Sequence, residues 1–195
     1  MAITTEQIKA FREKTGISVM QCRKVLEEAN GDFDKAIILL RKKGSDAAAK
    51  KAERTLKAGR IASYIHGIGS AGAMVELSCE TDFVSKNEEF QKLAYEIAMQ
   101  IVATNPTYAK KDDVNEEEKK KVLAVLEEEV KGKPEAMKEK ILAGKLDAFF
   151  KEKILMEQDY IKDPSVTIKS LIENATNKFG EKIEIGRYVR FVVGK

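Results

Sequence analysis

Apolar residues recur at intervals of three and four along the first 44 residues, and helix-start and helix-stop residues divide them into three segments. Thr4 or Thr5 can cap the first segment, Ser18 opens the second, and Asp32 caps the third. The apolar positions of the segments are Ile8 and Phe11, then Val19, Cys22, Val25 and Leu26, then Phe33, Ala36, Ile37 and Leu40. The pattern predicts three short helices that present a surface, since a module this small is near the size limit for independent folding.

From Ile61 the period changes to two, which is typical of strands. Residues 61–66 and 73–79 alternate in this way and are joined by a glycine-rich stretch, so we expect a hairpin. Helical spacing returns at Phe90, Leu93, Ala94, Ile97, Ala98, Ile101 and Val102. This spacing predicts an amphipathic helix, and Ser85 with Glu88 fits the capping box that would open it.

The second half of the chain is highly charged before it ends in an alternating segment. Residues 115–131 and 134–156 are expected to be helical, and a further helix is expected from Val166 to Phe179, closed by Gly180. Residues 183–193 alternate and should return to the sheet as a strand. Helices packed on a small antiparallel sheet define an α+β core, which is the predicted fold class.

The predicted organisation is a three-helix domain over residues 1–44, a basic helical linker over 45–60 and an α+β core over 61–195. Eight basic residues lie between Arg41 and Arg60, against Asp46 and Glu53 alone. A solvated helix face is one interpretation of this stretch, and a contact with an acidic surface or RNA is the other.

Composition and charge limit the class of protein but do not identify its function. Hydrophobic residues make up 43% of the chain and charged residues 34%, which predicts a folded core under a charged surface. The formal net charge of +3 is too small to indicate nucleic-acid binding by itself. Cys22 and Cys79 fit neither a disulfide pattern nor a zinc motif, and the start of the chain lacks a secretory signal. We therefore expect a cytoplasmic protein with reduced thiols, no membrane span and no bound metal or cofactor.

Two patterns suggest chemistry but have simpler explanations. The run from Gly67 to Gly72 matches GxGxxG, yet the residues after it alternate like a strand, whereas a dinucleotide site needs a helix there. Cys79 lies across the predicted hairpin from the strand that carries His66, the only histidine, and a cysteine–histidine pair can form a thiolate nucleophile. Alternation places Cys79 on the apolar face of its strand, where cysteines are usually inert core residues.

The segment Thr81-Asp82-Phe83-Val84 leaves a strand and precedes a helix. In one interpretation Asp82 caps the helix and Phe83 fills the core. In the other the segment is a protruding wedge, with an aromatic anchor beside a charge, as at protein–protein hot spots. The residues alone leave both open.

Several sequence blocks resemble translation elongation factor Ts of bacteria and organelles, essentially from end to end. They are residues 12–16, 29–32, 40–44, 79–84, 156–158 and 161–163, and the ending from Arg187 to Phe191. The resemblance implies a ubiquitin-associated-like three-helix domain at the N-terminus. It departs at Val19, where many relatives carry Met, and at Gln21, where they often carry Asp.

The resemblance also implies a function, which is guanine-nucleotide exchange on the GTPase elongation factor Tu rather than enzymatic catalysis. Asp82 and Phe83 would enter near the magnesium site and displace the ion, with Thr81 and Val84 completing the segment. Arg12, Val19 and Met20 of the N-terminal domain would grip the nucleotide-binding domain. The factor would release GDP and stay bound until GTP enters.

The length of the chain leaves room for one copy of the core that longer relatives duplicate. The chain thus resembles the short form of the family, which works as a non-covalent homodimer, and its C-terminal strand is a plausible place for pairing. The competing hypotheses are an RNA-associated or ubiquitin-like-binding adaptor and, well behind it, a thiol enzyme that uses Cys79 and His66.

Overall fold

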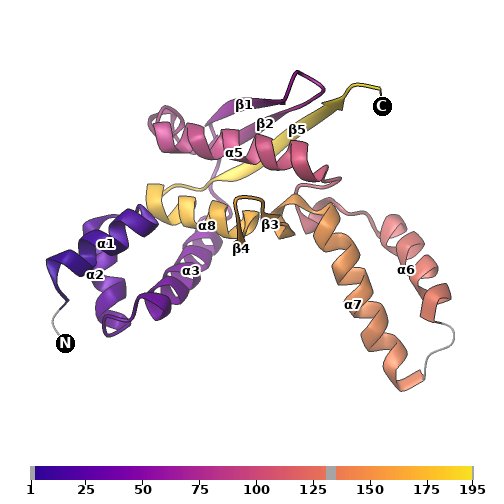
Figure 1. Cartoon of the computed structure of the whole chain (residues 1–195), viewed down its shortest axis with the longest axis horizontal. Coiled ribbons are helices and arrows are strands. Elements are labelled where there is room, and N and C mark those ends of the chain that lie inside the picture. The colour runs from indigo at the N-terminus through magenta and orange to yellow at the C-terminus, as the bar shows by residue number, and fades with distance from the viewer. Residues whose placement is uncertain (1–2, 131–134, 195) are drawn as a thin grey trace. The chain divides into compact units, whose positions relative to one another are not determined.

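The computed structural model describes residues 3–130 and 135–194 of the 195-residue chain (Figure 1). Its internal contacts divide it into two units. The first contains residues 3–60, 77–91 and 170–184, and the second contains residues 61–76, 92–169 and 185–194. Neither unit is one continuous stretch of sequence, because three strands and two helices of the described chain pass from one to the other.

Three helices begin the first unit, and each starts where its capping residue predicts. Helix α1 spans Thr5–Thr15, α2 spans Val19–Glu28 and α3 spans Phe33–Lys50. Thr4 and Ser18 close capping boxes with Gln7 and Gln21, and Asp32 accepts hydrogen bonds from the backbone at the start of α3. The helices enclose a buried cluster of Phe11, Ile17, Cys22, Val25, Leu26, Ala29, Ala36 and Leu40.

The third helix does not end near Gly44, where the sequence predicted it would. It continues to Lys50, and the chain then turns and enters a strand at Ala58, so the stretch 45–60 expected to be a helical linker is helical only in its first part. Gly44 is buried, and a Cβ atom there would lie 3.3 Å from Asn174 Oδ1 and from the Glu173 carbonyl oxygen of helix α8, Ile168–Phe179. The glycine allows the two helices to approach closely, a non-local role that local helix-stop signals do not reveal.

A three-stranded sheet in the order β1-β2-β5 is formed by Ala58–His66, Ala71–Cys79 and Glu184–Val192. The stretch from Gly67 to Ser70 is the turn between β1 and β2, with positive φ at Gly67 and Gly69. The GxGxxG match therefore lies in a hairpin and no helix follows it. Val193 N–H donates to Ser70 O while Arg187 pairs with Glu76, so β5 runs antiparallel to β2.

Helix α5, Glu88–Thr104, lies along one face of this sheet (Figure 1). In the second unit Arg190 Nε donates to the Val102 carbonyl oxygen at 3.1 Å, and the rings of Tyr64 and Tyr95 meet edge to face. The buried residues Ala73, Val75, Leu77 and Cys79 alternate along β2. The predicted α+β fold, with helices on a small antiparallel sheet, is confirmed.

The expected capping box of α5 is wrong. Ser85 ends a short helix, α4, Asp82–Ser85, and its hydroxyl donates to the Asp82 carbonyl oxygen. Asn87 caps α5 instead, since its Oδ1 accepts the Glu89 N–H at 2.9 Å.

Two charged helices of the second unit pack side by side, α6 over Glu116–Val130 and α7 over Glu135–Lys153 (Figure 1). They correspond to the helices expected over 115–131 and 134–156, of which residues 131–134 lie outside the described part. Val114, Phe150 and Ile154 are buried at their base. The short turns η1 and η2, Lys111–Asp113 and Leu155–Glu157, and the antiparallel pair β3 and β4, Asp159–Tyr160 and Asp163–Thr167, complete the unit before α8.

Candidate partner-binding site

The segment from Thr81 to Val84 lies between β2 and α5, and its residues face in different directions. Phe83 is 81% exposed and Asp82 is exposed beside it, whereas Val84 is only 4% exposed. The interpretation of Phe83 as core filler is therefore wrong for this structure, because Val84 takes that role. Asp82 is the first residue of α4 rather than its cap.

The carboxylate of Asp82 has one close cationic neighbour. Lys86 Nζ lies 2.5 Å from Asp82 Oδ2, one helical turn away, and both side chains are exposed. The hydrogen bond from Lys86 and its charge lower the pKa of Asp82 below the ordinary value. The site thus presents an aromatic ring beside an ionised carboxylate.

The base of the segment is held by two carboxylates that cross between distant parts of the chain. Glu181 accepts the N–H groups of Glu80 and Thr81 at 3.1 and 3.0 Å, and its other oxygen accepts the Thr81 hydroxyl at 2.6 Å. In return, Glu80 accepts the Lys182 N–H at 2.6 Å. We call Glu80, Thr81, Glu181 and Lys182 the carboxylate clamp. Glu181 and Lys182 were not predicted from the sequence, since no local pattern marks two loops about 100 residues apart as neighbours.

Arg54 strengthens the clamp from a third part of the chain. Its Nη1 lies 3.2 and 3.3 Å from the two oxygens of Glu80. The Lys182 backbone N–H and the Arg54 guanidinium lower the pKa of Glu80. Arg54, which belongs to the basic stretch, therefore forms an ion pair within the chain, and so does Lys43, which lies 2.6 Å from Glu28.

The thiol of Cys79 and the ring of His66 each have a partner of their own. Cys79 Sγ is buried and donates to the Thr81 carbonyl oxygen at 3.2 Å. Burial, together with the nearby charge of Glu181, raises the pKa of this thiol to about 11. His66 Nδ1 lies 3.0 Å from the Tyr64 hydroxyl. The thiol therefore lacks the depressed pKa that an activated nucleophile requires.

The predicted N-terminal contact residues are exposed at one end of α1 and the start of α2. Arg12 is exposed on α1, and Val19 and Met20 are 51% and 82% exposed in the first turn of α2. Gln21, one of the two departures from the family pattern, is used locally, because it closes the capping box with Ser18 and donates to the Asn177 carbonyl oxygen.

Helix α8 connects the N-terminal helices with the segment inside the first unit. Gln21 of α2 donates to Asn177 of α8 at 3.4 Å, and Lys178 of α8 forms an ion pair with Glu89 at the start of α5. Glu181 of the clamp follows directly after α8. The structure therefore places both groups of predicted contact residues in one unit.

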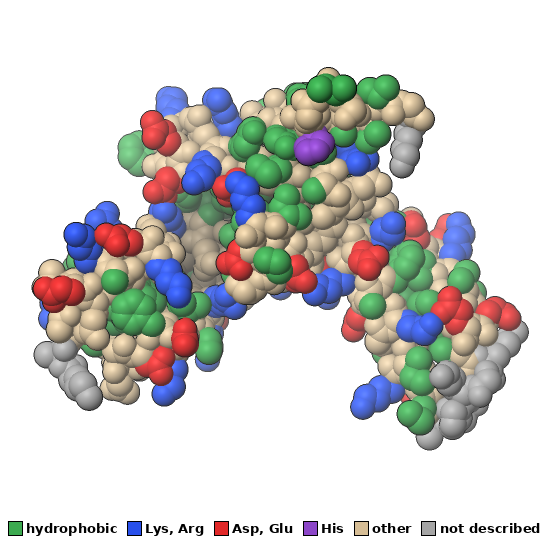
Figure 2. Space-filling view, in the orientation of Figure 1, with side chains coloured by type: hydrophobic (Ala, Val, Ile, Leu, Met, Phe, Trp, Pro, Cys, Tyr) green, Lys and Arg blue, Asp and Glu red, His purple; other side chains and the backbone are tan. Residues whose placement is uncertain are grey.

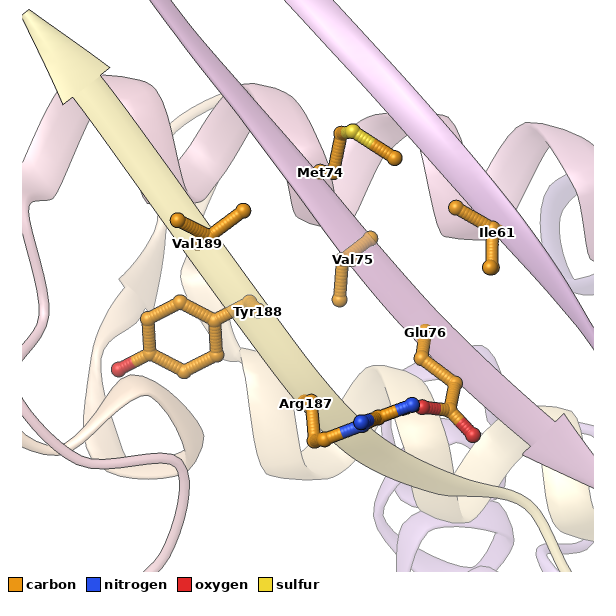
Figure 3. Close-up of a pocket in the computed structure, with 7 residues that line it drawn as sticks. All are labelled: Ile61, Met74, Val75, Glu76, Arg187, Tyr188 and Val189. Carbon is orange, nitrogen blue, oxygen red and sulfur yellow. Dashed lines mark hydrogen bonds and ion pairs between the residues drawn. The ribbon is translucent and has the colours of Figure 1, made fainter.

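The sheet face opposite α5 is apolar and carries a shallow depression of about 350 Å³ (Figure 3). Ile61, Met74 and Val189 come from three adjacent strands, and the guanidinium of Arg187 lies against the carboxylate of Glu76 at 3.1 Å. Hydrophobic side chains also gather around the β1–β2 hairpin, near the single histidine (Figure 2). The exposed apolar residues of this region, which we call the outer sheet face, are Ile61, Ile65, Met74, Val189, Phe191 and Val193.

No group of three or more His, Cys, Asp or Glu side chains is arranged to hold a metal ion in the part of the chain that the structure describes. Among the same residues, no helix is both long and apolar enough to cross a bilayer.

These features define an α+β protein with a three-helix N-terminal bundle and an exposed acid–aromatic pair on an anchored base. The sequence model described as Elongation factor TS matches residues 39–195. The chain belongs to the elongation factor Ts family, and it is therefore a translation elongation factor. It is 50% identical to Elongation factor Ts of Thermodesulfovibrio yellowstonii, covering 100% of this chain and 98% of that protein.

Two further relatives agree over nearly their whole length. Elongation factor Ts of Carboxydothermus hydrogenoformans is 47% identical, covering 99% of this chain and 90% of the relative. Elongation factor Ts of Thermotoga maritima is 44% identical, covering 100% and 98%. The chain is thus close in length to these relatives.

Proposed function

We propose that this chain is a guanine-nucleotide exchange factor for elongation factor Tu and that Asp82 and Phe83 enter the GTPase near its magnesium site. The observation that carries the proposal is the 81% exposure of Phe83 beside an ionised Asp82, while Val84 and Thr81 anchor the segment. An exposed aromatic ring beside a charged group on an anchored segment is typical of a protein–protein hot spot. Membership of the elongation factor Ts family supports the choice of partner.

The proposed mechanism needs no covalent chemistry on this chain. Mg²⁺ neutralises the phosphates of a bound nucleotide, so displacing the ion weakens GDP binding. Linkage requires that GDP weakens binding of the exchange factor by the same factor. The factor therefore stays bound to the empty GTPase until GTP enters.

The test is stopped-flow release of fluorescent GDP from elongation factor Tu. We expect the wild-type chain to accelerate release strongly in the presence of Mg²⁺. The acceleration should shrink when the ion has already been removed by a chelator, because the displacement step then has nothing left to do. An unchanged release rate with Mg²⁺ present would contradict the exchange function, and equal acceleration with and without Mg²⁺ would contradict displacement of the ion.

The N-terminal helices are proposed to hold the nucleotide-binding domain of the GTPase through Arg12, Val19 and Met20. The exposure of Met20, 82%, leaves an apolar side chain free for a partner surface. These residues share a unit with Asp82 and Phe83, so one unit of the chain can supply both contacts.

We also propose that the protein is a non-covalent homodimer paired through the outer sheet face. The supporting observation is the continuous set of exposed apolar side chains on three adjacent strands (Figure 3). A self-complementary patch of this kind suits a two-fold interface.

A cytoplasmic location, with no direct binding of nucleic acid, completes the proposal. Both cysteines are free, as expected in a reducing compartment. The overall charge is only +3, and Arg54 and Lys43 of the basic stretch form ion pairs within the chain.

A further inference from the structure

We infer that Glu181 is a positioning residue for nucleotide exchange: from the loop after α8 it fixes the base of the segment that carries Asp82 and Phe83. The inference rests on the proposed exchange function and adds a residue to it. Glu181 does not belong to the exposed pair, and it would act through Thr81.

Three hydrogen bonds end on the carboxylate of Glu181. Glu181 accepts two backbone N–H groups and one hydroxyl, all between 2.6 and 3.1 Å. Bonds to an ionised acceptor are stronger than bonds between neutral groups. The two amides belong to consecutive residues, Glu80 and Thr81, so the carboxylate fixes the orientation of the peptide plane between them.

The Thr81 hydroxyl bonds to Glu181 and does not cap helix α4. Thr81 stands at the N-cap of α4 in an extended conformation, φ −128° and ψ 156°, where a threonine hydroxyl ordinarily accepts a bond from the helix. Its side chain makes no such bond and donates to Glu181 instead. The hydroxyl therefore fastens the start of the segment to a distant loop, at the expense of capping α4.

The hydrogen bonds of the clamp run in both directions between residues 80–81 and 181–182, which specifies one geometry. Glu80 accepts the Lys182 N–H, and Glu181 accepts the N–H groups of Glu80 and Thr81. Each of the two loops therefore holds the backbone of the other. The Lys182 ammonium donates to the Ala52 carbonyl oxygen at 2.7 Å, which ties the same loop to the end of the N-terminal region. Gly180, with φ +72°, makes the turn that brings Glu181 there.

The clamp ends where the proposed contact pair begins. Asp82 bonds locally to Lys86, and Phe83 is exposed, so Thr81 is the last residue before them that is fixed from elsewhere. Val84 is buried on the other side of the pair. Without Glu181 the fold around Val84 would remain, but Asp82 and Phe83 would be held on the Val84 side only. The segment would then lose conformational freedom during binding, which costs binding free energy.

This predicts an effect on the exchange step rather than on docking. The N-terminal helices would still bind the GTPase, but the segment would occupy its inserted arrangement less often. For Glu181→Ala we expect a fall of about tenfold in the maximal GDP release rate, the factor for one lost bond to a charged group. The half-saturating concentration of the exchange factor should change by less than about twofold.

The experiment uses the full chain and stopped-flow release of fluorescent GDP over a range of factor concentrations. The variants are Glu181→Ala, Glu181→Gln and Thr81→Val, with the double variant of Glu181→Ala and Thr81→Val. Glu173→Ala is the matched control, since Glu173 is also half-buried and lies on α8 before the clamp loop. Because Glu181 acts through Thr81, the double variant should lose less than the product of the two single losses. The control should match wild type.

A second measurement reports the clamp without any GTPase. Amide hydrogen exchange of Glu80 and Thr81 should accelerate in Glu181→Ala while the core amides of Val75 and Leu77 keep their protection. A wild-type maximal rate for Glu181→Ala, a loss confined to the half-saturating concentration, strictly multiplicative losses, or unchanged exchange at Glu80 and Thr81 would each overturn the inference. If wild type itself fails to release GDP, the exchange function fails, and the amide measurement still decides whether Glu181 fixes the segment.

Discussion

Phe83 and Phe90 show how exposure distinguishes a proposed binding residue from a core residue. Phe83 is 81% exposed, whereas Phe90, seven residues later, is fully buried and packs edge to face on Phe179. The same residue type therefore has two environments within seven residues, exposed in α4 and buried in α5. Only the environment that the fold builds around each ring distinguishes them.

Replacing Phe83 should damage exchange without damaging the fold. We expect Phe83→Ala to lower the efficiency of GDP release by about 30-fold, corresponding to about 2 kcal/mol for a central aromatic anchor. The midpoint of thermal unfolding should stay near that of wild type, because the ring buries little area in the free protein. The control Val125→Ala removes an exposed apolar side chain from α6 and should leave release unchanged. Wild-type release by Phe83→Ala would contradict the wedge.

Cys79 should behave as a core residue with pH-dependent reactivity. Burial and the charge of Glu181 raise its pKa from 9.0 to about 11, so at pH 8 the folded chain holds almost no thiolate there. Because the folded pKa lies above the unfolded one, this thiol contributes stability that is present below about pH 9 and lost as the pH rises towards 11. Labelling by a thiol reagent at pH 8 should be slow until denaturant is added. Rapid labelling of Cys79 in the folded chain would contradict this.

At the scale of elements, local signals predicted what local forces decide. The caps Ser18 and Asp32 act within three residues of themselves, so the starts of α2 and α3 were correctly expected. The alternation along β2 predicted its buried face for the same reason. The short helix α4 was missed because four residues carry too little periodicity to show one.

The errors have a common physical cause, which is contact between residues far apart in sequence. The three-helix domain was expected to end at residue 44, but α3 continues to Lys50 and Gly44 packs against Asn174. Glu181 had no visible function until the fold brought it to Thr81. The exposed pair of the candidate site could be identified from the family pattern, whereas the residues that support it required the structure.

Two helical glycines should respond in different ways to the same substitution. Gly144 in α7 has no atom near the position of an added Cβ, so Gly144→Ala should raise the free energy of unfolding by about 0.5–1 kcal/mol. At Gly44 the added Cβ would lie 3.3 Å from two oxygen atoms of α8, which offsets that gain. We expect the unfolding midpoint in urea to rise for Gly144→Ala and to stay level or fall for Gly44→Ala. Equal gains in both variants would show that α3 and α8 do not pack as closely as described.

At the scale of the whole molecule, the sequence matches show the family, and the structure shows which residues share a unit. Family membership rests on the match over residues 39–195 and on relatives that align with nearly the whole chain. The structure adds that the N-terminal helices, the exposed pair and the clamp belong to one unit. The outer sheet face belongs to the other unit, so the proposed pairing of two chains and the proposed binding of the GTPase would use different residues.

A charged substitution on the outer sheet face should therefore separate assembly from folding. Val189 and Phe191 are exposed on β5, and their replacement by Lys places an ammonium group against the same apolar face of a second copy. We expect Val189→Lys with Phe191→Lys to give the mass of one chain by light scattering at micromolar concentration, where wild type gives twice that mass. Val125→Lys on α6 is the matched control and should remain dimeric. A wild-type chain with the mass of a monomer would contradict the proposed dimer. A double lysine variant that still has the mass of a dimer would show that the interface lies on another surface. GDP release by the monomeric variant then shows whether one copy carries a complete exchange site, since Asp82, Phe83 and Glu181 all come from a single chain.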